Sequence, residues 1–263
     1  MMPSDLRRPT ARSTPPVPAG RRGGASPRRR GEPEQEGGHS RVQRALGLTP
    51  LFDRASRASR EAAAAAGVLE VVPGGALIVE QGAAPDALVV IGRGRARVDR
   101  SSADGRVVPL GYRGAGELLG ASCLGRPPAY TESATAMEEL ECVRLPLPVV
   151  DALLVEDPEI GPAMLSLLLA RQREVEDRIE SLLFRNVEGR LVEFLLKAAD
   201  RWGVPTPRGT LISAPLTHLE IAQSIGSTRE TVTLTLGALR REGLLDVAGR
   251  RLVVRDREAL SAR

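Results

Sequence analysis

The chain has 263 residues, a formal net charge of +4, 42% hydrophobic residues and only 2% aromatic residues. This length predicts two domains with an aliphatic core. The scarcity of aromatic residues argues against a single-stranded nucleic-acid binder that is built on stacking platforms. Two cysteines and two histidines exclude a disulfide framework, a four-cysteine zinc site and a multi-histidine metal site. Because no apolar stretch is long enough to span a bilayer and the start lacks a secretory signal, we expect a cytoplasmic protein without a membrane partner.

The basic residues are concentrated at the two ends of the sequence. Residues 1–46 hold 10 basic and four acidic residues, and residues 205–263 hold nine basic and six acidic ones. The first of these segments is rich in Arg, Pro, Gly and Ser and too poor in aliphatic residues to offset its ordering entropy, so we expect a disordered basic tail. Its cluster Arg28-Arg29-Arg30 could attract nucleic acid without sequence specificity. The reading that we favour is a plain solvated tail or a start codon assigned too far upstream.

The next part of the sequence predicts a β domain over residues 47–156. Residues 47–66, with their run of alanines, are expected to form a helix. From residue 67 to about residue 146, short apolar stretches alternate with Gly, Pro and Asp. The predicted strands are 71–72, 76–79, 88–91, 95–98 and 107–110. This regular spacing is typical of a closed or sandwiched β domain.

A long helix is predicted over residues 157–186, starting at Asp157-Pro158-Glu159. Five aliphatic residues in it follow a seven-residue a/d repeat, with Gln172 at one further a/d position. They are Leu165, Leu168, Val175, Ile179 and Leu182. Such a narrow stripe favours a seam between two copies of the chain. The alternative is that the stripe packs against its own domain.

Residues 187–263 predict a winged helix-turn-helix domain. A helix from Gly189 to about Trp202 is followed by a loop over residues 203–209. Thr217 and Glu220 form a capping box, and the short helix that they start ends at Gly226. A second helix begins within residues 227–230, which gives the outline of a helix-turn-helix. The pattern then predicts a β-hairpin with a basic tip, the wing.

The second helix of this motif carries the candidate DNA-reading residues. Arg229 and Glu230 lie at its N-terminal end, where a recognition helix contacts base edges. Arg can pair with guanine, and a carboxylate can accept from the cytosine amino group. Phosphate contacts are assigned to Ser227, Thr228, Thr231, Thr233, Arg240, Arg241, Arg250 and Arg251. The alternative is a plain capping box from Ser227 to Glu230, with Arg229 as a solvated charge.

The stretch Gly226-Ser227-Thr228-Arg229-Glu230-Thr231-Val232 resembles the recognition-helix signature of the Crp/Fnr family of bacterial transcription regulators. Residues 77–98 resemble the family's cyclic-nucleotide-binding β-roll, and residues 157–190 its dimerisation helix. The resemblance covers about residues 48–255. It implies an α+β fold with an N-terminal, jelly-roll-like β-roll, a long dimerisation helix and a C-terminal winged helix-turn-helix. It also implies a homodimer on palindromic double-stranded DNA, with recognition helices roughly 34 Å apart, and RNA polymerase as a candidate partner.

The sequence departs from the cyclic-AMP receptor branch of this family at the ligand contacts. Ala121 falls at the ribose-binding carboxylate, and Glu132-Ser133 falls at the Arg-Ser pair that takes the phosphate. Val175 and Glu176 replace hydroxyl residues that contact the adenine. The residues expected to line the effector pocket are Gly120, Ala121, Arg126, Glu132, Ser133, Val175 and Glu176. Because a buried carboxylate would repel a cyclic phosphate, we predict that cyclic AMP does not bind in the usual pose.

The residue types of the chain also bear on which other effectors it could sense and on which other functions it could have. The oxygen-sensing branch needs an N-terminal cysteine cluster that this sequence lacks, and haem has only Cys123 as a candidate ligand, which is more typical of a small buried hydrophobe. An unidentified small ligand, a protein input and constitutive DNA binding remain open. A β-roll module that has lost DNA binding is disfavoured by Arg229 and Glu230. A cupin-like enzyme is disfavoured because His39 and His218 are the only histidines, so we expect no enzyme.

Overall fold

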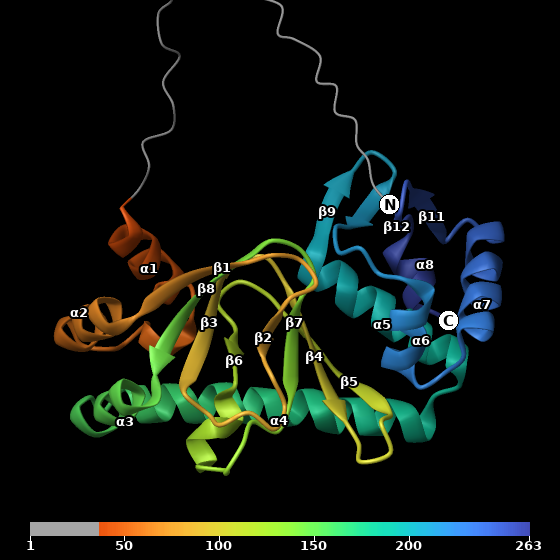
Figure 1. Cartoon of the computed structure of the whole chain (residues 1–263). Coiled ribbons are helices and arrows are strands. Elements are labelled where there is room, and N and C mark those ends of the chain that lie inside the picture. Colours follow the sequence, from red (N-terminus) through yellow and green to blue (C-terminus); the bar gives the residue numbers. More distant parts are fainter. Residues whose placement is uncertain (1–36) are drawn as a thin grey trace, which may run out of the picture. The chain divides into compact units, whose positions relative to one another are not determined.

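The computed structural model describes residues 37–263 and contains a β-roll of two four-stranded antiparallel sheets (Figure 1). The first sheet has the spatial order β1 (Val68–Val72), β8 (Leu140–Pro146), β3 (Ala87–Arg93) and β6 (Leu118–Leu119). The second has the order β2 (Leu77–Val79), β7 (Ser133–Ala136), β4 (Ala96–Ser101) and β5 (Val107–Arg113). The five strands that the sequence predicts are therefore confirmed as β1 to β5.

Strand β3 is the centre of this domain because it is buried on both faces. Val89 and Ile91 belong to the apolar cluster between the two sheets. Leu88 and Val90 point the other way and join a second cluster with the surrounding helices. Successive side chains of a strand alternate between its faces, so a continuous apolar run is what a strand covered on both sides requires. The core is aliphatic, as the composition predicts.

The N-terminal helix α1 (Gly38–Leu46) corrects the extent of the predicted tail. Val42, Ala45 and Leu46 lie on one face of this helix and are buried in the core, so the prediction of disorder is wrong for residues 38–46. Apolar residues at this spacing can anchor a short helix even within a polar sequence. The cluster Arg28-Arg29-Arg30 and the rest of the predicted tail lie outside the described residues.

The helix expected over residues 47–66 is interrupted. A short 3-10 helix, η1 (Pro50–Phe52), precedes α2 (Arg57–Ala66), whose N-cap Ser56 accepts a hydrogen bond from the backbone N–H of Ser59. The continuous helix is therefore wrong for residues 47–56, because Pro50 and two capping side chains divide the segment. The β-roll also contains η2 (Ala121–Gly125) and α3 (Leu147–Glu156).

The predicted long helix is confirmed as α4 (Ile160–Phe184). Asp157 lies just before it and accepts hydrogen bonds from the backbone N–H groups of Glu159 and Ser56. The five aliphatic residues of the a/d stripe are between 39% and 56% exposed. The stripe is thus only partly covered by its own chain and keeps a large apolar surface exposed. Within residues 37–263, each helix is too short or too polar to span a lipid bilayer.

The C-terminal domain contains four helices and a four-stranded sheet. Its elements are α5 (Val187–Trp202), β9 (Gly203–Thr206), β10 (Gly209–Ile212), α6 (His218–Ile225), α7 (Arg229–Arg241), β11 (Leu245–Ala248), β12 (Arg251–Val254) and α8 (Arg257–Ser261). The sheet has the order β11-β12-β10-β9, so the loop predicted over residues 203–209 is wrong for residues 203–206 and 209, and only residues 207–208 form a turn. Strand β9 lies at the edge of the sheet and has no partner strand on one side. A proline, which lacks a backbone N–H, is tolerated in such a strand, as Pro205 is here.

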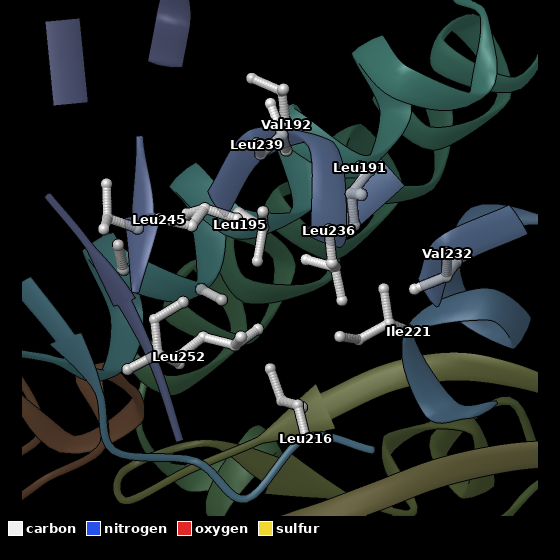
Figure 2. Packing of buried hydrophobic residues seen from close by; sticks show 14 of the residues in the cluster. Leu191, Val192, Leu195, Leu216, Ile221, Val232, Leu236, Leu239, Leu245 and Leu252 are labelled. Atoms are coloured by element: carbon white, nitrogen blue, oxygen red, sulfur yellow. The ribbon is translucent and has the colours of Figure 1, made fainter. Parts of the chain in front are cut away.

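The core of this domain joins α5, α6, α7 and the sheet. Leu195 of α5, Ile221 of α6, Leu236 of α7 and Leu252 of β12 belong to one buried cluster (Figure 2). Tyr112, from strand β5 of the β-roll, also belongs to it and packs edge to face on Trp202, with ring centroids 5.3 Å apart. The β-roll and the C-terminal domain therefore share an apolar contact.

Candidate nucleic-acid interface

The two helices of the helix-turn-helix are joined by a tight turn at Gly226. This glycine has φ 63° and ψ 51°, the left-handed conformation that ends many helices. A Cβ atom at this position would also come within 3.0 Å of Leu182 Cδ2 of α4. Both constraints favour glycine, which fixes the angle at which α7 leaves α6.

Side-chain caps define where both helices begin. At α6, Thr217 accepts from the backbone N–H of Glu220, and Glu220 accepts from the backbone N–H of Thr217, which confirms the capping box. At α7, the N-cap is Thr228, whose hydroxyl accepts from the backbone N–H of Thr231 at 3.2 Å. The capping box that we considered from Ser227 to Glu230 is therefore wrong. Glu230 is not used to cap the helix and stays available on its first turn.

Helix α7 has one buried face and one exposed face. Val232, Leu236 and Leu239 are buried in the domain core, and Arg229, Glu230, Thr233 and Leu234 are exposed. Among residues 37–263, no charged side chain pairs with Arg229 or Glu230 within 4.0 Å, so both are free to contact a partner. Leu234 is 74% exposed, which is unusual for a leucine on a helix that has its own core.

His218 links the two helices, a role that the sequence reasoning missed. Its Nδ1 atom lies 2.8 Å from Thr233 Oγ1, and that hydroxyl donates its hydrogen to the backbone carbonyl of Arg229 at 2.8 Å. Because the hydroxyl hydrogen is already used, Thr233 accepts and His218 Nδ1 donates. Thr233, which we assigned to a phosphate, thus holds α6 against α7. The sequence signals this link between the helices only by a histidine that follows the N-cap residue of α6.

The wing is the β-hairpin of β11 and β12, which confirms the predicted hairpin. Gly249 takes φ 63° in its turn, and Arg250 and Arg251 are exposed beside it. Neither guanidinium has an acidic partner among the described residues within 4.0 Å. A turn that places positive charge at an exposed tip suits contact with a phosphate backbone.

The residues assigned to the effector pocket do not form a single cluster. The backbone N–H of Gly120 lies beside the Glu132 carboxylate, but burial dominates and raises the pKa of Glu132 above its usual value. Arg126 is exposed and lies 3.6 Å from Asp151. Ser133 accepts a hydrogen bond from Gln81 N, Val175 and Glu176 are exposed on α4, and half-buried Ala121 begins η2.

Tyr130 is a second residue that the sequence reasoning missed. It is 4% exposed, and its Oη atom lies 2.7 Å from the carbonyl of Ala87 and 2.8 Å from Asp86 Oδ1. A Cβ atom on Gly120 would lie 2.9 Å from the Tyr130 ring. The ring therefore packs directly against the turn that would enter the effector pocket.

The cysteines behave as small core residues. Cys123 and Cys142 are both free and buried in the cluster between the sheets. Burial raises the pKa of the Cys123 thiol to about 11 and that of Cys142 to about 12. Both thiols are therefore protonated at neutral pH, although a metal ligand must be a thiolate. Within the described range, no three Cys, His, Asp or Glu side chains gather as metal ligands.

Comparisons with known proteins identify both domains. Residues 69–157 match the family described as "Cyclic nucleotide-binding domain", and residues 189–263 match "Crp-like helix-turn-helix domain". The chain is 29% identical to the "CRP-like cAMP-activated global transcriptional regulator" of Mycobacterium tuberculosis, over 73% of this chain and 85% of that protein. It is 31% identical to the "Cyclic AMP receptor protein" of Thermus thermophilus, over 70% of this chain and 82% of that one.

A solved structure agrees with these relatives. The crystal structure of a CRP-family transcriptional regulator from Thermus thermophilus has a TM-score of 0.63 and 27% identity to this chain. The match covers 73% of this chain and 95% of the chain in that crystal structure. The relatives are transcription regulators and not enzymes. The chain therefore belongs to the Crp/Fnr family of DNA-binding transcription regulators.

Proposed function

We propose that two copies of this regulator associate through α4 and place two α7 helices in successive major grooves of a palindromic DNA site. The observation that carries the proposal is the exposed face of α7, on which Arg229 and Glu230 lie without an acidic or basic partner from the described chain. Arg can make two hydrogen bonds to guanine, and a carboxylate can accept from cytosine. The two side chains together suit a G·C-containing half-site.

The association through α4 is supported by the exposed stripe from Leu165 to Leu182. Five aliphatic residues at a/d spacing on one helix match the requirement of a two-helix seam. Burying them removes apolar surface from water, which favours association. Because each copy carries one α7, a two-fold dimer reads a palindrome.

The effector that we propose is a molecule other than cyclic AMP. Glu132 is a half-buried carboxylate where the phosphate of the cyclic nucleotide would lie, and the Tyr130 ring packs against the Gly120 turn. Arg126, the nearest basic candidate, is exposed and paired with Asp151. A cyclic phosphate at this place would meet the Glu132 carboxylate, which repels it, where it needs a hydrogen-bond donor.

We place the action of the protein in the cytoplasm and name RNA polymerase as its second macromolecular partner. Both follow from the role of a bacterial transcription regulator, which meets its DNA beside a promoter. Contact with polymerase is expected only in the DNA-bound dimer.

The test uses a duplex that wild-type protein selects from a random library, with affinity measured by fluorescence anisotropy. Replacing Arg229 by Ala should cost about 1–3 kcal/mol per half-site, while the dependence of binding on salt stays nearly unchanged because no phosphate contact is lost. Arg60→Ala is the matched control, because Arg60 is exposed on α2 of the β-roll. Equal affinity of wild type and Arg229→Ala, or a selected site without two-fold symmetry, would contradict the proposal.

A further inference from the structure

A cavity of about 420 Å³ lies where β5, α4 and α5 meet, between the β-roll and the C-terminal domain. Strand β5 contributes Leu110 to Arg113, and α4 contributes residues between Glu174 and Leu182. The remaining walls come from α5 and from Ser224 and Ile225 at the end of α6. Leu182 alone belongs to both the cavity lining and the exposed a/d stripe. The cavity therefore overlaps the proposed seam at one residue, and its other walls come from the single chain.

Unsatisfied polar atoms gather in this cavity. In the described part of the chain, four buried side-chain nitrogen or oxygen atoms make no well-formed hydrogen bond, and three of them belong to residues that line it. These three atoms are Tyr112 Oη, Arg113 Nη2 and Ser224 Oγ. Burial raises the pKa of the Tyr112 phenol, and the Ser224 hydroxyl lies close enough to lower that pKa in part, but the two groups do not meet in good hydrogen-bond geometry. Tyr112 is 5% exposed and Arg113 is 6% exposed. Leaving buried polar groups without partners is costly, so their concentration at one place indicates a missing polar ligand.

Two cations of the cavity, Arg178 and Arg190, have no carboxylate within 4.0 Å among the described residues, and a third, Arg113, has only loose ion pairs. The nearest carboxylate oxygens to the Arg113 guanidinium, on Glu174 and Glu117, lie 3.8 Å and 3.9 Å away, beyond hydrogen-bond distance. Arg178 donates only to backbone carbonyls, those of Pro109 at 2.6 Å and Ser224 at 2.9 Å. Burial lowers the pKa of Arg178, which shows the cost of holding this charge without an anion.

Four carboxylates line the cavity, on Glu174, Asp177, Glu193 and Asp200, and the last two are held by cations. Glu193 is paired with Lys197 at 2.7 Å and with Arg185 at 3.4 Å. Asp200 is paired with Arg257 at 2.6 Å. Arg190, a further cation of the lining, donates only to backbone carbonyls. The lining holds five cationic side chains against four carboxylates, an excess of one positive charge.

The other walls are aromatic and aliphatic. Tyr112 and Trp202 meet edge to face at an interplanar angle of 84°, and Phe194, Ala198 and Ile225 complete the apolar surface. A cavity of this size and lining suits a small molecule with a planar or apolar body. Water alone would leave this apolar surface wetted, and the guanidinium groups of Arg178 and Arg190 would have no counter-charge beside them.

We propose that this cavity binds a small organic anion, whose carboxylate or phosphate accepts from Arg113 Nη2 and Ser224 Oγ and whose apolar body lies against Tyr112 and Trp202. The ligand would touch the β-roll through Arg113 and the helix-turn-helix through Ser224, and so would strengthen the contact between the two domains. This site is separate from the Gly120 and Glu132 region of the β-roll.

Trp202 is the single tryptophan of the chain and lines the cavity, so its fluorescence reports occupancy. The full-length protein is titrated without DNA, which keeps the outcome independent of the proposed DNA site. The probes are phenyl phosphate, benzoate, inorganic phosphate and the neutral phenol. We expect saturable quenching with phenyl phosphate or benzoate, binding of inorganic phosphate at least tenfold weaker, and no saturation with phenol. The aromatic anion that binds more tightly identifies the acid group.

Variants locate the binding. Arg113→Met should weaken the binding of the tighter aromatic anion roughly tenfold or more. Ser224→Ala is a milder change and should weaken that binding about two- to tenfold. Arg106→Met is the matched control, because its guanidinium is exposed on the turn between β4 and β5. Circular dichroism checks that each variant is folded. Absence of saturation with both aromatic anions, or equal affinity in wild type and Ser224→Ala, would overturn the proposal. If inorganic phosphate binds as tightly as phenyl phosphate, the claim that the ligand has an organic body is wrong.

Discussion

Glu220 and Arg97 connect the helix-turn-helix to the β-roll through a carboxylate that has two separate roles. Oε2 of Glu220 accepts from the backbone N–H of Thr217 at 2.8 Å and closes the capping box of α6. Oε1 of the same side chain lies 3.4 Å from Arg97 Nη1 on strand β4. The residue that starts the first helix of the DNA-binding motif therefore also ties that helix to the effector domain.

Substitutions at Glu220 should separate these two roles. Glu220→Gln keeps a side chain that can cap the helix and loses the ion pair, so we expect a loss of about 0.2–1 kcal/mol in the free energy of unfolding. Glu220→Ala also loses the cap, which adds about 0.3–1.5 kcal/mol. Urea unfolding measures both, and a double-mutant cycle with Arg97→Met isolates the ion pair. Equal losses in the Gln and Ala variants would show that the cap contributes nothing.

The contrast between these two roles shows what the sequence can reveal. The capping box, the Gly226 turn and the wing were predicted because each depends on residues a few positions apart. The contact of Arg97 with Glu220 joins residues more than a hundred positions apart, and nothing in either local pattern indicates it. Tyr112 is the same case: its strand was predicted, but its insertion beside Trp202 depends on how two domains pack.

The predicted DNA-reading residues lie together on one helix, and the predicted effector residues are spread over distant segments. Arg229 and Glu230 share one helical turn, so their common exposure follows from the period of the helix. The effector residues come from distant segments, and the structure keeps Arg126 and Glu176 on partners of their own. The segment Gly203–Thr206 was predicted to be a loop because Pro205 masked an edge strand.

The proposed dimer predicts a specific sensitivity of α4. Ile179 is 52% exposed in the single chain and lies in the a/d stripe. Ile179→Glu would place a charge in the seam, so we expect dimer dissociation to become at least tenfold more favourable. Sedimentation equilibrium measures the dissociation constant. Val155→Glu is the control, because Val155 is 86% exposed at the end of α3, outside the stripe. An unchanged dissociation constant in the Ile179 variant would place the interface elsewhere.

Leu234 predicts a change in DNA preference. It stands on the exposed face of α7, one turn beyond Glu230, so a longer side chain at this position extends from the same face as the candidate base-reading residues. Leu234→Arg should add a preference for guanine at one position of each half-site, worth about 1–3 kcal/mol. Sequences selected from random duplexes reveal the preference. Val155→Arg adds the same charge away from α7, so it should leave the selected sequence unchanged. If both variants select the wild-type site, Leu234 does not face a base.

Cyclic AMP should not bind at micromolar concentrations. Glu132 presents a half-buried carboxylate where a cyclic phosphate needs a donor, and the Tyr130 ring packs against the Gly120 turn. Isothermal titration calorimetry of the full-length protein should therefore show no saturable heat with this nucleotide. DNA binding by the same preparation serves as the control for folding. Micromolar affinity would show that the β-roll opens around the nucleotide despite these two residues.

The two tyrosines should respond in opposite ways to loss of the hydroxyl. Tyr112 Oη is buried and makes no well-formed hydrogen bond in the described chain, with the Ser224 hydroxyl as its only close polar neighbour, so Tyr112→Phe should leave the free energy of unfolding unchanged or raise it at neutral pH. Tyr130 Oη bonds to Asp86 and Ala87, so Tyr130→Phe should lower it by about 0.5–1.5 kcal/mol. Chemical unfolding at neutral pH compares the two variants directly. A large loss on Tyr112→Phe would reveal a hidden partner for its hydroxyl.

Tyr112 should also make the contact between the domains sensitive to alkali. Burial raises the pKa of its phenol from 10.0 to about 12, so the folded protein favours the neutral form. A group with a raised pKa in the folded state contributes fully below its unfolded pKa and loses that contribution as the pH rises through the folded value. The loss should therefore begin near pH 10 and be complete above pH 12, and it should be on the order of 2 kcal/mol. Unfolding at several alkaline pH values should show a steeper decline in wild type than in Tyr112→Phe. Parallel declines would mean that the pKa of the phenol is the same in the folded and unfolded states, so that burial does not raise it.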